Sequence, residues 1–122
     1  IEGLTLFLLS EQASPQMGKI FIREQMDPTP AFDALYNSTI KPMHEMVTML
    51  VERVTGLTGQ EAVVAAQAII GQAIIFKTHR EVALRRTGWT SYGEKETLAI
   101  TWAVKQQTDA ILDMYAAKRK PS

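Results

Sequence analysis

Two histidines are the side chains whose type and neighbours come closest to a known catalytic pattern. His44 and Glu45 begin a pattern like the zinc-protease helix motif, but Thr48 stands where that motif needs a second histidine. His79 lies beside Arg80 at the polar end of an apolar segment, where a histidine is more often a satisfied surface or core-edge residue than a ligand. The chain has no cysteine, and we find no phosphate-binding loop, nucleophile elbow or carboxylate pair. We therefore expect no metal, no cofactor and no catalytic residue.

Three methionines, Met43, Met46 and Met49, surround Pro42 and suggest binding rather than catalysis. Methionine fills irregular space, so this cluster is typical either of ordinary core packing or of a deformable wall of a small-molecule pocket. An apolar pocket also uses a few polar groups, which tyrosine, glutamine and histidine supply. The predicted ligand-binding residues are Phe21, Gln25, Tyr36, Ile40, Met43, Met46, Gln72, Phe76 and His79.

The elements that must position these side chains are helices. No segment alternates apolar and polar residues between turn signals, so we predict an all-α fold without strands. The predicted helices cover residues 2–11, 15–26, 30–55, 60–79 (continuing or restarting as far as 86) and 94–118.

Prolines set one corner and one kink in this plan. Within REQMDPTPAF (residues 23–32), Pro28 and Pro30 end one helix and start the next, with Thr29 as N-cap. Pro42 lies inside the predicted third helix, where its missing N–H leaves the carbonyl of Ser38 without a partner. We therefore expect a fixed corner near residue 28 and a kink near residue 42.

The last two helices each carry two apolar faces. In the segment 62–76, one face holds Ala62, Ala66, Ile69, Ala73 and Phe76. Another face holds Val64, Ala68, Gly71 and Ile75 and continues to Val82. One face can pack on the chain's own core, and a second copy is the natural cover for the other, although the chain can also use all this area internally. The predicted contact between two copies is a four-helix arrangement that uses Ala66, Ile69, Ala73, Trp102, Ala103, Ala110, Ile111 and Met114.

Length and charge narrow the function classes. The 122 residues suit one domain over residues 1–122, and 46% hydrophobic residues suffice for a core. The formal net charge is zero, and nothing in that balance attracts nucleic acid, whose binding proteins usually carry a basic patch. The longest apolar stretch, 62–76, is about 22 Å long as a helix, shorter than a bilayer core of about 30 Å, so we expect no membrane span. The lack of cysteine suits the cytoplasm.

Several segments in a fixed order carry a resemblance to a known family: REQMDPTPAF, Tyr36, the triplet 42–44, and the stretch 71–76 leading to Gly88 and Trp89. Together they resemble the C-terminal domain of TetR-family transcriptional regulators, in the CecR (YbiH)-like branch. The resemblance covers about residues 22–104. It implies an all-helical domain that dimerises through its last two long helices and encloses an effector pocket in the helices before them. It also implies that operator DNA is bound by an N-terminal helix-turn-helix domain. Because the chain begins inside an apolar run, we expect it to be a fragment without that domain.

The resemblance supplies no ligand residues, because pockets differ among members of this family. The main hypothesis is an effector-sensing and dimerisation domain of a repressor, in which a small molecule releases the operator. The first alternative is a constitutive dimerisation module without an effector, and the second is a small helical enzyme. An enzyme needs an acid or base with a perturbed pKa in a cleft, and the sequence offers no such pair.

Overall fold

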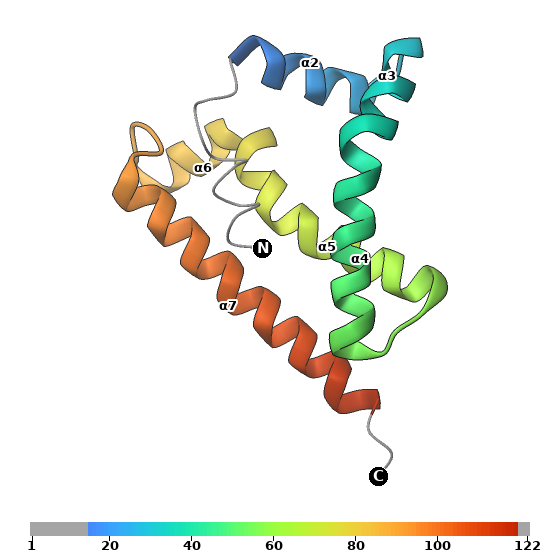
Figure 1. The fold of residues 1–122 in the computed structure, drawn as a ribbon. Coiled ribbons are helices and arrows are strands. Elements are labelled where there is room, and N and C mark those ends of the chain that lie inside the picture. The colour runs from blue at the N-terminus through green and yellow to red at the C-terminus, as the bar shows by residue number, and fades with distance from the viewer. Residues whose placement is uncertain (1–14, 120–122) are drawn as a thin grey trace.

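A computed structural model describes residues 15–119, and within that range the chain is helical with no strand (Figure 1). The predicted all-α class is therefore confirmed. The predicted helix over residues 2–11 lies outside the described residues. The elements are α2 (Pro15–Met26), α3 (Pro30–Leu35), the π-helix η1 (Tyr36–Ile40), α4 (Lys41–Thr55), α5 (Gly59–Thr78), α6 (Arg80–Thr87) and α7 (Glu94–Arg119).

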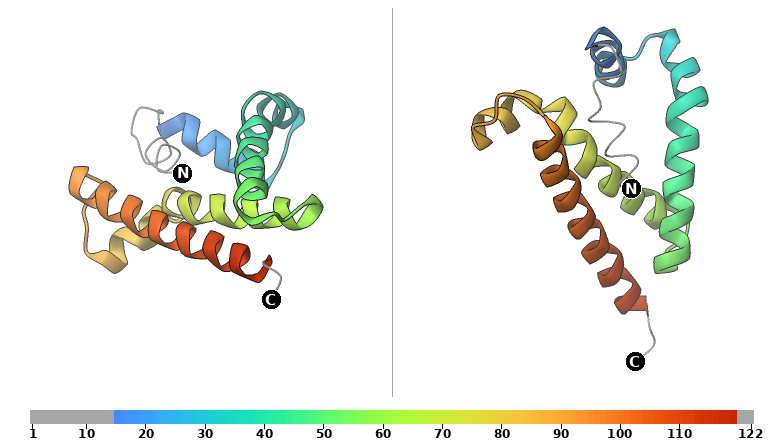
Figure 2. Two further views of the ribbon diagram at one scale, coloured as in Figure 1. Left: turned by 60° about the horizontal axis from the view of Figure 1, so that its bottom comes forward. Right: turned by 60° about the vertical axis from the view of Figure 1, so that its left-hand side comes forward.

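The core lies where α4, α5 and α7 meet. Helix α5 turns back across α4, α7 packs against both, and α2 and α3 extend from the start of α4 (Figures 1 and 2). The buried side chains form two groups. The α4–α5 cluster contains Val47, Val51, Ala65, Ala66, Ile69 and Ile70. The α5–α7 cluster contains Ala73, Leu84, Tyr92, Ile100 and Val104.

Helix α5 is longer than the apolar stretch seen in the sequence. Its 20 residues span about 30 Å, and α5 is the one helix in the described range long and apolar enough to cross a bilayer. Length therefore does not exclude a membrane span, contrary to our estimate from residues 62–76. Six α5 side chains are instead buried within the chain, which is the packing of a core helix.

The proline corner forms as predicted. Helix α2 ends with the N–H of Asp27 bonded to the carbonyl of Arg23 at 2.8 Å. Thr29 is the N-cap of α3, and its side-chain oxygen accepts a hydrogen bond from the N–H of Ala31 at 3.3 Å. Pro30 occupies the first helical turn, so α3 begins where the sequence predicts.

The predicted helix 30–55 is three elements rather than one kinked helix. Ahead of Pro42, the N–H of Lys41 bonds to the carbonyl of Tyr36, five residues earlier, and residues 36–40 form a π-helix. A π-turn widens the helix by one residue, which accommodates a proline that cannot donate in the ordinary pattern. The irregularity expected at Pro42 is thus present, as a widened turn just before it.

Glycines end two of the helices with left-handed backbone. Gly56 (φ 76°) caps α4 and Gly88 (φ 79°) caps α6, each with its N–H bonded to a carbonyl four residues earlier. Between them, the break at His79 divides the predicted fourth helix, so the chain restarts as α6 rather than continuing. The loop after α6 is held by Tyr92, whose hydroxyl donates to the carbonyl of Phe76 at 2.7 Å.

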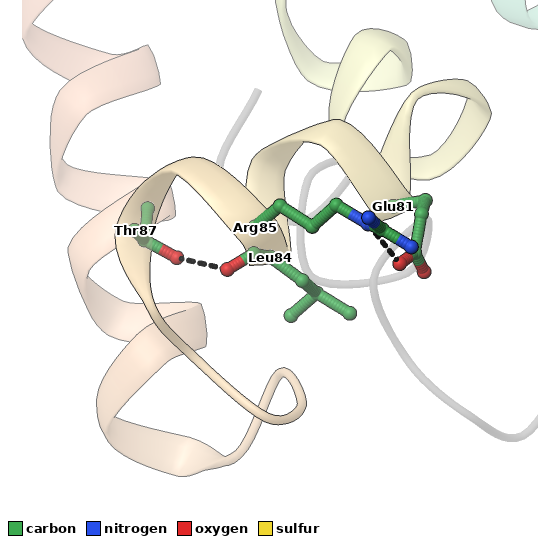
Figure 3. Close-up of polar contacts among 4 residues, drawn as sticks. All are labelled: Glu81, Leu84, Arg85 and Thr87. Carbon is green, nitrogen blue, oxygen red and sulfur yellow. Dashed lines mark hydrogen bonds and ion pairs between the residues drawn. The ribbon is translucent and has the colours of Figure 1, made fainter.

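The arginines of α6 lie on its surface. The Nε of Arg85 donates to Glu81 Oε1 at 2.8 Å, and the hydroxyl of Thr87 donates to the carbonyl of Leu84 (Figure 3). The guanidinium of Arg80 lies 5.2 Å from the ring centre of Tyr92. Arg80 and Arg85 therefore both have partners within the chain.

Candidate functional site

The corner between α2 and α3 contains a buried carboxylate that the sequence alone does not single out. Glu24 is only 4% exposed. Its Oε2 accepts the N–H of Thr29 at 2.9 Å, and its Oε1 accepts the hydroxyl of Thr29 at 2.8 Å. These hydrogen bonds, first the backbone one and then the hydroxyl, hold the pKa of Glu24 below its usual value. The carboxylate therefore stays ionised and ties the end of α2 to the cap of α3.

The lowered pKa predicts how the stability of the domain depends on pH. A carboxylate with a depressed native pKa contributes stability above its unfolded pKa, and this contribution is lost as pH falls through the native value. We expect Glu24→Gln to lower the melting temperature at pH 7, and we expect the difference from the wild type to shrink as pH is lowered below about 4. Melting curves across pH measure this, with Glu52→Gln as the exposed control. A difference that does not change with pH would contradict the prediction.

The predicted methionine wall along α4 is divided between the inside and the outside of the chain. Ile40 is buried, and Met43 is half-buried against the α4–α5 cluster. Met46 and Met49 are about half exposed, at 52% and 46%. The side of α4 that carries Met46 and Leu50 therefore presents apolar surface that the described residues leave uncovered.

The two histidines differ in environment. His44 is half-buried on α4, and burial lowers its pKa, which favours the neutral imidazole. His79 is exposed at the end of α5, where its Nδ1 lies 2.9 Å from the hydroxyl of Thr78. Residues 15–119 contain no group of three histidine, cysteine or acidic residues placed to hold a metal.

The side chain of Gln72 on α5 is the most unusual polar group in the domain. Both its amide oxygen and its amide nitrogen are buried, and neither has a hydrogen-bond partner within the described part of the chain. Phe76 lies one turn further along and packs against the α5–α7 cluster. A buried amide without a partner is costly, so this position is poorly explained by the stability of the fold alone.

We expect Gln72→Met to stabilise the domain, although it removes a polar side chain from a partly buried site. Methionine has a similar length and shape, and it leaves no buried donor or acceptor unpaired. The free energy of unfolding should rise by about 1 kcal/mol, as measured by chemical denaturation. Gln60→Met, at an exposed position of the same helix, is the control and should change it by less than about 0.5 kcal/mol. A loss of stability in Gln72→Met would show that the amide makes favourable interactions.

The nine predicted ligand-binding residues do not form one group. Met43 packs against the α4–α5 cluster, whereas Phe76 packs against the α5–α7 cluster. Gln25 and Tyr36 are exposed, as are Met46 and His79 described above. The side chain of Phe21 lies outside the described part of the structure. Of the predicted ligand-binding residues whose side chains are described, those that are buried or half-buried are Ile40, Met43, Gln72 and Phe76.

The residues predicted to join two copies include both buried and exposed side chains. Ala66, Ile69 and Ala73 are each 1% exposed and pack inside the single chain, so they have no surface left for a second copy. Ala103 and Ile111 are half-buried. Trp102 is 66% exposed on α7, and Ala110 and Met114 are exposed on the same helix.

The exposed side of α5 is the second apolar face recognised in the sequence. We call it the α5 stripe: Val64, Ala68, Gly71 and Ile75, all of them exposed. Val64 is 67% exposed and Ile75 50%, high values for β-branched apolar residues in the middle of a helix. A Cβ built at Gly71 would meet no atom within 4 Å, so the middle of the stripe is open. The two faces could be found from periodicity, but which one is internal could not.

Two comparisons with known proteins identify the family of this chain. Residues 1–114 match the family model described as the C-terminal domain of the HTH-type transcriptional dual regulator CecR. A curated relative, the HTH-type transcriptional dual regulator CecR of Shigella flexneri, is 32% identical over 107 residues. The match covers 86% of this chain and 48% of the relative, so the chain spans about half the relative's length. The chain therefore belongs to the family of C-terminal domains of CecR-type transcriptional regulators.

Proposed function

We propose that this chain is the effector-sensing and dimerisation domain of a TetR-family DNA-binding repressor, in which a small molecule releases the operator. The observation that carries the proposal is the α5 stripe, an exposed apolar surface along a helix whose other side is core. A soluble protein rarely leaves such a surface uncovered. Family membership favours action by binding rather than by catalysis.

The dimer contact in this proposal is a twofold four-helix arrangement of α5 and α7. The α5 stripe supplies one half, and the exposed Trp102, Ala110 and Met114 of α7 supply the other. A twofold contact places the same patch on both subunits, so a stripe with glycine near its centre can face its own copy at short distance. This assignment uses exposed side chains in place of the buried Ala66, Ile69 and Ala73.

The effector site in this proposal lies at the end of the molecule where α4 begins, α5 ends and α2 passes over them (Figures 1 and 2). Ile40 at the end of η1, Met43 of α4 and Phe76 of α5 would offer apolar contact there, and Gln72 would offer an unpaired amide. An amide both donates and accepts, so it suits an apolar molecule that carries one hydroxyl, carbonyl or amide group. The effector would supply the hydrogen bonds that Gln72 lacks.

In this proposal, operator DNA is bound through the helix-turn-helix part of the regulator. The neutral charge of this chain agrees with this, because binding to the phosphates of DNA relies on an excess of basic residues. Because the relative is described as a dual regulator, the proposal covers activation as well as repression. We place the whole regulator in the cytoplasm, where it can reach DNA, with α5 as a core helix rather than a membrane span.

Light scattering and thermal shift test the proposal in sequence. A dimer should have twice the 13.6 kDa mass of the chain and should persist on dilution. Small apolar compounds that bind the folded form should then raise the melting temperature of the wild type, and should do so much less for Gln72→Met. A compound that does this should release operator DNA from the complete regulator in an anisotropy assay. A stable dimer for which no compound acts would instead support the constitutive dimerisation module, and a monomer would remove the main support for both.

A further inference from the structure

We propose that residues 15–35 form a rigid arm, locked at its corner by Glu24, and that this arm pivots on the rest of the domain at the π-helix η1. The inference rests on the proposed function, because it names the moving part that would carry a signal from the effector site toward the DNA-binding part. Glu24 is then a positioning residue, and residues 36–40 are the joint.

The rigidity of the arm comes from the corner. Only residues 27–29 separate α2 from α3, and prolines 28 and 30 fix two of the backbone angles there. Across this short connection, both carboxylate oxygens of Glu24 accept hydrogen bonds from Thr29, which in turn caps α3. A charged acceptor makes stronger hydrogen bonds than a neutral one, and its burial shields them from water. The two helices should therefore turn as one body.

The arm has little else to hold it within the described part of the chain. Within the described residues, the main contact of α2 is with α3, which follows it directly in the chain, and α2 has no comparable contact with α4, α5, α6 or α7. Helix α3 contains no buried residue, and in η1 only Ile40 is buried. Figures 1 and 2 show α3 continuing outward from the start of α4, and α2 turning back from α3 above the end of α5.

The joint is weaker than the corner for reasons of backbone geometry. A π-turn has a less favourable hydrogen-bond pattern than an α-helix and occurs mostly as a single turn at functional positions. Pro42 has no N–H to offer the carbonyl of Ser38, so the ordinary helical pattern cannot be restored by a small shift. The side chains of Ser38 and Thr39 bond only locally and are exposed. Bending should therefore concentrate between Tyr36 and Ile40.

Distances between paired spin labels test the arm and the joint separately. The chain has no cysteine, so two introduced cysteines are the only labelled positions. Lys19→Cys with Ala34→Cys reports on the arm, and Ala34→Cys with Glu52→Cys reports across the joint; all three positions are exposed. Labelled protein is mixed with excess unlabelled protein, so that only distances within one chain contribute. We expect a narrow distance distribution within the arm and a broader one across the joint.

Two variants then separate the lock from the joint. Glu24→Ala should broaden the distribution within the arm to about the width found across the joint, and Glu24→Gln, which keeps one acceptor, should have a smaller effect. Pro42→Ala should narrow the distribution across the joint and leave that within the arm unchanged.

Circular dichroism checks that each variant is folded. Two results would overturn the proposal. One is a wild-type distance distribution within the arm that is as broad as the one across the joint. The other is a distribution within the arm that Glu24→Ala leaves unchanged in folded protein. These measurements use neither effector nor operator, so their failure leaves the proposed function standing.

Discussion

Replacing Ile75 by glutamate should convert the proposed dimer into a monomer. Ile75 lies on the α5 stripe and is 50% exposed in the single chain, so the change should leave the fold of one subunit intact. In a twofold contact the residue appears on both sides, so one substitution introduces two carboxylates into an apolar interface. Burying each unpaired charge is costly, and the dissociation constant should rise by about a hundredfold or more.

The matched control is Val63→Glu, on the same helix but off the stripe. Val63 is 54% exposed, close to the value for Ile75, so the two changes are equal in chemistry and similar in exposure. Light scattering over a dilution series should show a monomer for Ile75→Glu and the wild-type mass for Val63→Glu. Equal masses for the two variants would mean that the α5 stripe is not where the copies meet.

Replacing Ile69 by alanine should destabilise the fold of the subunit itself. Ile69 is 1% exposed within the α4–α5 cluster, and truncation there removes buried methyl groups and leaves a cavity. The free energy of unfolding should fall by about 2–5 kcal/mol. Urea denaturation at a fixed protein concentration measures this effect, since dimerisation would otherwise shift the midpoint.

Val64→Ala provides the comparison, because it also truncates an apolar α5 side chain. Val64 is 67% exposed in the single chain, so in the monomeric background of Ile75→Glu its truncation should cost less than about 0.5 kcal/mol. Ile69→Ala should retain its full cost in that same background. If Ile69→Ala lost its effect in the monomer, Ile69 would belong to the contact between copies, as its sequence pattern suggested.

Local signals made much of the fold predictable. Thr29 and Pro30 set the start of α3, and Gly56 ends α4, because each acts through the backbone of its immediate neighbours. The periodicity of α5 likewise indicated two apolar faces. It did not indicate which face is internal, because alanine, valine and isoleucine occur on both. That choice depends on where α4 and α7 pack, which no local pattern contains.

The candidate site was less predictable for the same reason. Glu24 looks like a surface acid near the end of a helix, and its role arises only because the chain turns back to bring Thr29 within hydrogen-bond distance. The π-helix is a response to Pro42 that a simple kink does not anticipate. The sequence predicts Gln72 as a polar group of a pocket, and the structure adds that its amide is buried without a partner in the described residues.

The place of α7 in the core has a consequence for the order of events during synthesis. Helices α4 and α5 are joined by a three-residue turn, so this hairpin can form as soon as both have left the ribosome. Helix α7 comes last along the described chain, yet it completes the α5–α7 cluster and carries Trp102 and Met114 of the proposed interface. We therefore expect nascent chains to remain unpaired until α7 has left the ribosome and packed against α5.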